Sequence, residues 1–100
     1  MSRYQTYVYP PAWAEIAELP GHVKQRVRRA IDSLAVDPQP SQSKALTVSR
    51  DGIALYRLRL DRWRILYAVN PESKLIQVLA VRKRPPYDYN DLDKLLQQLL

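Results

Sequence analysis

The side chains best able to do chemistry in this chain are arginines and tyrosines, and they gather in its second half. Four arginines lie between Tyr56 and Tyr67, and a basic triplet at residues 82–84 is followed by two more tyrosines. A guanidinium binds phosphate through paired hydrogen bonds and stabilises the extra charge of a phosphoryl transition state. Tyrosine adds a hydroxyl and a ring on which a base can stack. These groups are suited to cleaving RNA without a metal, with the RNA 2′-hydroxyl as the nucleophile.

Other catalytic groups are scarce. The chain has one histidine, His22, no cysteine, no glycine-rich phosphate loop, and no cluster of carboxylates or imidazoles at metal-ligand spacing. His22 follows a Pro-Gly pair at the start of an expected helix, where an ordinary surface residue is the simplest interpretation. We therefore expect no cofactor and no metal. The same absences argue against a histidine-pair nuclease, a metal-dependent nuclease and a Ser-His-Asp hydrolase.

The charge distribution supports an anionic partner. The net charge is +6, and residues 57–84 account for all of it with eight basic and two acidic side chains. Such a patch favours nucleic acid, an acidic protein or an anionic membrane surface. Composition alone does not choose among these three partners.

One hundred residues, 46% of them hydrophobic, predict a single domain spanning residues 1–100. No apolar run is long enough to span a bilayer, and the first residues lack the apolar segment of a signal peptide. The sequence thus predicts a cytoplasmic protein that does not associate with a membrane, and the absence of cysteine fits a reducing compartment.

The first half of the chain should supply support rather than chemistry. Residues 4–9 are rich in aromatic and β-branched side chains and predict a strand that ends at a Pro-Pro pair. Pro11 suits the first turn of a helix, which Pro20-Gly21 ends. A second helix follows, with apolar residues on one stripe and basic ones mostly off it. The pattern predicts a two-helix hairpin, and residues 37–43 after it form a loop by their proline and polar content.

The arginines belong to the second half, where three strands are expected at about residues 53–60, 62–69 and 74–82. Short connections, with turn residues at Asp51-Gly52, Asp61 and residues 70–73, predict an antiparallel meander. Because side chains alternate along a strand, Arg57 and Arg59 share one face, as do Arg62 and Arg64. The bland interpretation, equally consistent with composition, is that strand arginines only keep an exposed sheet soluble.

A final helix is predicted from Asn90, which can cap it, with acidic residues in its first turn. Its apolar stripe should dock on the sheet or on a partner and consists of Leu92, Leu95, Leu96 and Leu99. The expected fold is therefore α+β: an N-terminal strand, a two-helix hairpin, a three-stranded antiparallel meander and a C-terminal helix.

This order of elements resembles the RelE/ParE superfamily of toxins from type II toxin–antitoxin systems, and the likeness covers nearly the whole chain. The segments that carry it are Tyr56-Arg57-Leu58-Arg59-Leu60, Trp63-Arg64-Ile65-Leu66-Tyr67, and Val81-Arg82-Lys83-Arg84 followed by Tyr87. Ser43-Lys44-Ala45-Leu46 and Asp51-Gly52 look like the family loop that leads into its second strand, and Tyr67-Ala68-Val69-Asn70 looks like its third-strand ending.

The resemblance implies an activity and a set of residues. RelE-type members enter the ribosomal A site and cut mRNA there. The matching catalytic positions are Arg57, Arg59, Arg64, Arg84 and either Tyr87 or Tyr89. The basic residues expected to bind RNA around them are Lys44, Arg62, Arg82 and Lys83. Well-known members carry lysine at the first two positions, and arginine there is a poor general base because its pKa stays above about 12. The base is therefore left open among Lys83, Lys44, a tyrosinate, or catalysis by positioning alone with help from ribosomal RNA.

Two alternatives remain. The ParE branch shares the fold, inhibits DNA gyrase and needs no catalytic set, although the complete run of basic residues with a late tyrosine favours RelE. A non-catalytic module would use the same arginines only to bind the RNA backbone. The toxin interpretation implies as partners the ribosome, mRNA and a cognate antitoxin with an acidic, amphipathic segment. That segment is expected to replace the last helix on the sheet, at the place where the leucine stripe of that helix docks.

Overall fold

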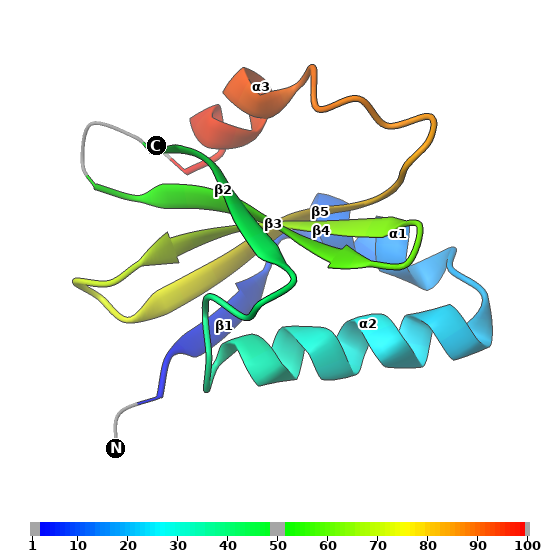
Figure 1. Ribbon diagram of the computed structural model, residues 1–100, viewed down its shortest axis with the longest axis horizontal. Helices are drawn as coiled ribbons and strands as arrows, with labels where there is room; N and C mark the ends of the chain where they lie inside the picture. Colours follow the sequence, from blue (N-terminus) through cyan, green and yellow to red (C-terminus); the bar gives the residue numbers. More distant parts are fainter. Residues whose placement is uncertain (1–2, 49–51, 100) are drawn as a thin grey trace.

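A five-stranded sheet lies between helices on its two faces in the computed structural model, which describes residues 3–48 and 52–99 (Figure 1). The elements are β1 (Gln5–Val8), α1 (Pro10–Ala17), α2 (Gly21–Leu34), β2 (Ser43–Val48), β3 (Ala54–Leu60), β4 (Trp63–Asn70), β5 (Leu75–Lys83) and α3 (Leu92–Gln97). This arrangement confirms the predicted α+β fold. None of the described helices is long and apolar enough to cross a membrane.

The sheet has the strand order β1-β5-β4-β3-β2. Strands β3, β4 and β5 form the expected antiparallel meander, whereas β1 pairs in parallel with β5. Strand β2 was not expected: the interpretation of residues 43–46 as a loop is wrong, because they pair antiparallel with β3. Its polar residues are those of a sheet edge, and its pairing shifts register between Ala45 and Thr47. Asp51, expected in the turn before β3, lies outside the described residues.

The helical hairpin covers one face of the sheet. Prolines occupy the first turn of α1, as predicted, and the α2 stripe of Val23, Val27, Ile31 and Leu34 is buried. These side chains pack in one core cluster with Ile65, Tyr67, Val69, Ile76 and Val78 of the sheet. This packing fixes β4 and β5 as a rigid platform for the side chains on the opposite face.

The opposite face carries a smaller apolar cluster under α3. Leu95 is 2% exposed and packs with Leu55, Leu66 and Leu79. The prediction that Asn90 caps this helix is wrong, because α3 begins at Leu92 with Asp91 as its N-cap residue. Tyr89 has a left-handed backbone (φ 63°), and the Asn90 amide donates to the Asp88 carboxylate, so the chain is still turning there.

Candidate nucleic-acid interface

Three arginines from three neighbouring strands form a row on the α3 side of the sheet, here called the arginine row. Arg59 of β3 lies opposite Arg64 of β4, which in turn lies opposite Arg82 of β5. Like charges directly opposite each other destabilise a sheet. Carboxylates, solvent or a bound anion can compensate the charges of such a row.

A second basic pair lies beside the row. Lys44 of β2 is the register partner of Arg57 of β3, and both share the face of the arginine row because Arg57 and Arg59 are two residues apart. Arg57 Nη1 donates to the Gln42 carbonyl over 2.9 Å, which holds its guanidinium near the loop before β2. The structure thus gathers five predicted residues on one face: Lys44, Arg57, Arg59, Arg64 and Arg82.

Arg64 is held in place by the backbone of the β3–β4 hairpin. Its Nη1 lies 2.9 Å from the carbonyl oxygens of both Asp61 and Trp63. The predicted tight turn is confirmed, since Leu60 pairs with Trp63 and Asp61 takes a left-handed φ of 56°. A guanidinium has five N–H donors, so these contacts leave donors for a ligand.

Arg82 differs from the rest of the row because two carboxylates neutralise it. Glu15 of α1 forms an ion pair with its Nε, and Asp91 lies 3.0 Å from its Nη1. Glu15 also accepts the amide N–H of Val81. These contacts fasten the end of β5 to α1 and to the residue that begins α3.

Tyr87 completes this network. Its hydroxyl donates to Asp91 over 2.5 Å, and its ring lies 5.2 Å from the guanidinium carbon of Arg82. Burial, and then the hydrogen bond to Asp91, raise the pKa of the Tyr87 hydroxyl well above its usual value. Burial alone raises the pKa of Asp91, but hydrogen bonds from Tyr87 and Arg82 outweigh it and hold that pKa below its usual value. In this arrangement the Tyr87 hydroxyl is the donor of the hydrogen bond to Asp91, and its raised pKa keeps it protonated.

Arg84 and Tyr89 form a separate pair beyond the strand. The guanidinium carbon of Arg84 lies 4.9 Å from the Tyr89 ring, and the Tyr87 and Tyr89 rings meet edge to face at 4.9 Å. Both predicted tyrosines therefore lie at the end of β5. The geometry gives them different partners: Tyr87 contacts Arg82, and Tyr89 contacts Arg84.

The chain matches the sequence model of the ParE toxin of type II toxin–antitoxin systems, parDE, over residues 10–85. It belongs to this toxin family, within the RelE/ParE superfamily. A search of curated proteins finds no match.

Solved structures of RelE toxins have the same fold as this toxin. The toxin in the archaeal RelE–RelB complex from Pyrococcus horikoshii OT3 is 27% identical, with a TM-score of 0.76 over 87% of this chain and 100% of that chain. The RelBE2 complex from Mycobacterium tuberculosis gives 22% identity and a TM-score of 0.68 over 82% and 99% of the two chains. The isolated Escherichia coli RelE toxin is 19% identical, with a TM-score of 0.66 over 97% of this chain and 99% of that chain. The toxin thus combines a ParE sequence match with a RelE-like fold.

Two predicted RNA-binding residues of the toxin lie away from the arginine row. Lys83 is the register partner of Trp63, so its side chain lies on the face of the sheet that the helical hairpin covers, opposite to that of Arg82. Arg62 is exposed in the β3–β4 turn, where its carbonyl accepts the Arg84 amide over 2.7 Å. Their roles in binding RNA stay predictions.

The sequence interpretation did not assign the two acidic residues that organise this site. Asp91 was placed only in the first turn of a helix, and Glu15 had no role. A signal was present for Asp91, which is four residues after Tyr87 in a segment otherwise expected to bind phosphate. For Glu15 there was none, since only the packing of α1 brings it to the end of β5.

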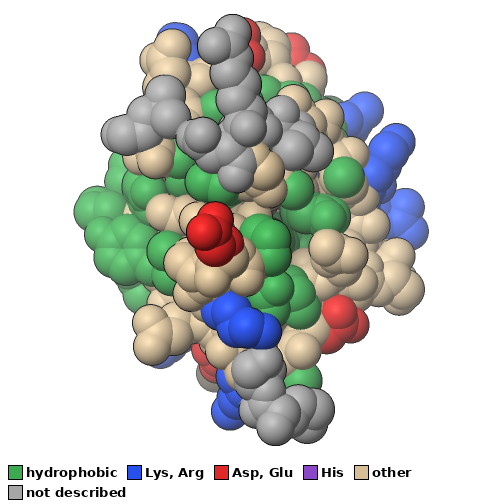
Figure 2. Space-filling view, turned by 90° about the vertical axis from the view of Figure 1, so that its left-hand side faces the viewer, with side chains coloured by type: hydrophobic (Ala, Val, Ile, Leu, Met, Phe, Trp, Pro, Cys, Tyr) green, Lys and Arg blue, Asp and Glu red, His purple; other side chains and the backbone are tan. Residues whose placement is uncertain are grey.

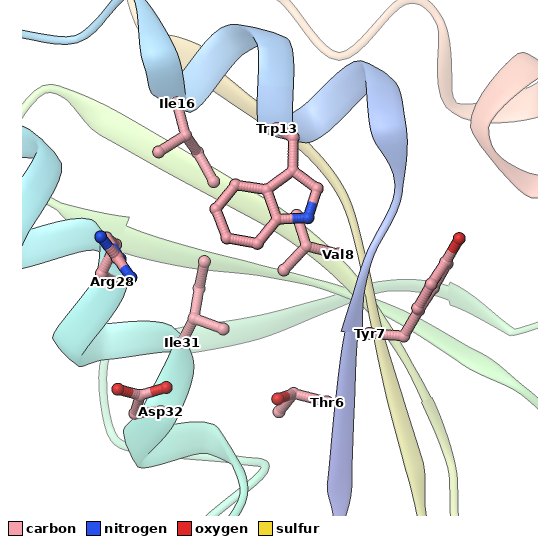
Figure 3. Close-up of a pocket in the computed structure, with 8 residues that line it drawn as sticks. All are labelled: Thr6, Tyr7, Val8, Trp13, Ile16, Arg28, Ile31 and Asp32. Carbon is pink, nitrogen blue, oxygen red and sulfur yellow. The ribbon is translucent and has the colours of Figure 1, made fainter.

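The remaining surface offers less to a phosphate. A hollow of about 320 Å³ between β1, α1 and α2 is lined by Val8, Trp13, Ile16 and Ile31 together with the opposite charges of Arg28 and Asp32 (Figure 3). Figure 2 shows the end of the molecule opposite the β3–β4 hairpin, where most charged side chains lie singly among hydrophobic ones.

Proposed function

We propose that the toxin is a ribosome-dependent endoribonuclease that cleaves mRNA in the A site and so inhibits translation. The RNA 2′-hydroxyl would attack the adjacent phosphate, forming a cyclic phosphate and releasing the 5′-oxygen of the next nucleotide. The observation that carries this proposal is the arginine row. Arg59 of β3 and Arg64 of β4 are in register and are arranged to bind the phosphate and the charge that develops on it, while Arg82 of β5 is already paired with Glu15 and Asp91.

Proton transfer is the less conventional part of the proposed reaction. Arg57 and Arg59 bind phosphate but do not accept a proton at neutral pH. Lys44 is better placed to do so than Lys83, because Lys44 shares the face of the arginine row. Tyr87 would stack on a base, because its raised pKa makes its hydroxyl a weaker acid than that of an ordinary tyrosine. The ribosome would then supply positioning that the toxin lacks alone.

We further propose that a cognate antitoxin restrains the toxin by replacing α3 on the sheet. The docked helix buries Leu95 and places Asp91 against Arg82 and Tyr87. An amphipathic antitoxin helix that took its place would carry Tyr87 away from the arginine row. Its acidic residues would neutralise the same arginines.

Gyrase inhibition is the second candidate, and the ParE sequence match over residues 10–85 is the observation that favours it. That activity would require no chemistry at the arginine row. The third candidate function is RNA binding without cleavage.

One experiment separates the three candidates. The toxin is incubated with mRNA on programmed ribosomes, with the same mRNA free in solution, and with gyrase in a supercoiling assay. The proposal expects cleavage only on ribosomes, and strong loss of cleavage in Arg59→Ala and Arg64→Ala. Arg28→Ala, which removes an exposed arginine of α2 that lines the hollow beside β1 and not the hairpin end, serves as the control. Inhibited gyrase with intact mRNA would overturn the proposal in favour of the second candidate, and RNA binding without cleavage would favour the third.

A further inference from the structure

A polar hollow of about 360 Å³, here called the hairpin pocket, lies beside the arginine row at the β3–β4 hairpin. Helix α2 supplies one wall, since this hairpin reaches towards the first turns of α2 (Figure 1). The lining residues are Arg26, Gln42, Arg59, Leu60, Asp61 and Arg64. Of the three arginines, only Arg26 comes from outside the arginine row.

The hairpin pocket has an excess of positive charge. Three guanidiniums line it with a single carboxylate, that of Asp61, which forms an ion pair with Arg26. The two side chains are 47% and 67% exposed. An exposed ion pair contributes little free energy, so another anion can replace one partner at small cost.

One guanidinium of the hairpin pocket is already held in place, and another is free to turn towards a ligand. Arg64 is fixed by two hairpin carbonyls, and the backbone amide of Arg59 donates to the Gln42 carbonyl over 3.1 Å. The side chain of Arg59 is exposed and has no bonded partner among the described residues. Binding an anion here therefore requires ordering of the Arg59 side chain but not of Arg64.

We propose that the hairpin pocket is a second phosphate site, in which Arg26, Arg59 and Arg64 bind a phosphodiester of RNA beside the one that is cleaved. Until RNA binds, the Asp61 carboxylate occupies the position on Arg26 that the phosphate would take. A chain of linked phosphates fits this geometry because the pocket continues directly from the arginine row through Arg59 and Arg64. The inference rests on the proposed function in naming RNA as the ligand, and it adds α2 to the RNA-binding surface.

Arg26→Gln tests the site, with Arg29→Gln as the matched control on the same helix. Arg29 is exposed and does not line the pocket. Binding of a short single-stranded RNA oligonucleotide is measured by fluorescence anisotropy at several salt concentrations. Loss of one phosphate contact should lower the slope of log K against log salt by about 0.7. We expect that change, with binding up to about fivefold weaker, only for Arg26→Gln. Equal effects of the two variants would overturn the proposal.

Asp61→Asn supplies an independent readout. Asparagine tolerates the left-handed backbone of position 61, so the turn should be kept, and thermal unfolding checks that it is. With the competing carboxylate removed, RNA binding should become about threefold tighter. Weaker RNA binding by a folded Asp61→Asn variant would show that the ion pair positions Arg26 structurally, and would contradict the proposal.

Polyglutamate serves as the carboxylate probe in the same assay. If Arg26→Gln weakened polyglutamate binding and left RNA binding unchanged, the pocket would be a site for an acidic protein segment, and the proposal would be wrong. None of these measurements uses ribosomes or cleavage. The hairpin pocket can therefore be supported while the ribonuclease proposal fails, and the reverse result is equally distinguishable.

Discussion

Arginine at positions 57 and 59 separates phosphate binding from proton transfer. Both side chains keep their charge at any physiological pH, so they stabilise an anion without competing for its protons. The neighbouring polar groups are Lys44, on the same face, and Tyr87, whose hydroxyl is tied to Asp91. Catalysis at this site would then depend more on charge and positioning than on a strong base.

Replacement of Arg64 should affect turnover far more than folding. Arg64→Ala removes the central guanidinium of the arginine row, and we expect kcat on programmed ribosomes to fall by about 10²-fold. The free energy of unfolding should change by about 1 kcal/mol or less, because the side chain is half-exposed. Urea denaturation measures the second quantity. Arg64→Lys tests geometry, since a lysine keeps the charge but not the paired donors. A variant that unfolds would instead assign Arg64 a structural role.

The toxin should lose stability in acid, because Asp91 becomes protonated there. Its pKa lies below the usual value of 3.8, so the folded state binds this proton less readily than the unfolded state does. Stability from its contacts with Arg82 and Tyr87 is present above pH 4 and is lost as the pH falls through the lowered pKa. Asp91→Asn should remove this part of the acid dependence. Unfolding followed by circular dichroism between pH 2 and about 6 measures it, and identical acid profiles for the two proteins would contradict the assignment.

Strand alternation predicted part of this residue-level arrangement and missed the rest. The rule placed Arg57 and Arg59 on one face correctly, since each is separated from the other by one residue. It did not reveal the row itself, because the β4 residue opposite Arg59 and the β5 residue opposite Arg64 depend on the register of each strand pair. A register shift between Leu66 and Tyr67 changes the pairing of β4 with β5. The contact of Arg26 with Asp61 depends on how α2 packs under the sheet, and no local pattern encodes it.

At the scale of elements, α3 is a short helix that depends on its leucines. It has 6 residues, too few to be stable alone, so its docking must come from packing. The predicted stripe of Leu92, Leu95, Leu96 and Leu99 does face the sheet, in one cluster with Leu55 and Leu66. Whether an antitoxin binds at this stripe stays a proposal.

Leu95→Ala should loosen α3. Removal of this buried side chain should lower the free energy of unfolding by about 2–3 kcal/mol, measured by urea denaturation. Leu99→Ala is the control, because that side chain is only partly buried. If the antitoxin replaces α3, Leu95→Ala should also bind it more tightly, as less packing must be broken. Weaker binding would mean that the antitoxin docks on α3 in place.

Two features differ from the expected elements, namely strand β2 and the start of α3, and each difference has a physical reason. Strand β2 follows a segment of prolines and polar residues, and Ser43 and Lys44 carry no alternating apolar signal. Its identity depends on pairing with β3. The start of α3 was placed at Asn90 because that residue type favours caps, but the left-handed Tyr89 and the turn at Asp88 delay the helix to Leu92. Strand pairing decides the first feature and backbone turns decide the second, and side-chain periodicity reports neither.

At the scale of the whole molecule, a buried tyrosine links the sheet to the loop before β2. The Tyr67 hydroxyl donates to the Pro38 carbonyl over 2.8 Å, and its ring stacks on that of Tyr56. Burial is the main reason that the pKa of Tyr67 rises from 10.0 to about 12. The folded toxin therefore keeps this proton at a pH where the unfolded chain has lost it.

Alkaline pH should destabilise the toxin through Tyr67. Between pH 10.0 and about 12 the unfolded state loses the proton first, so the free energy of unfolding falls as the pH rises. The slope from this one group is at most about 1.4 kcal/mol per pH unit. Tyr67→Phe lacks the titrating group and should show a shallower decline in urea unfolding across this range. A decline as steep as that of the unchanged protein would assign the alkaline sensitivity to other groups.

The parallel pairing of β1 with β5 has a consequence for how the toxin is made. Gln5 pairs with Leu75, and β5 is also the partner of β4. A ribosome that synthesises the toxin must therefore release β1, both helices of the hairpin and most of the meander before the strand that joins them emerges. Contacts between residues so far apart in sequence form slowly, since a long loop must close first. A nascent chain is thus kept from assembling the arginine row while most of it is being translated, because Arg82 belongs to that last strand.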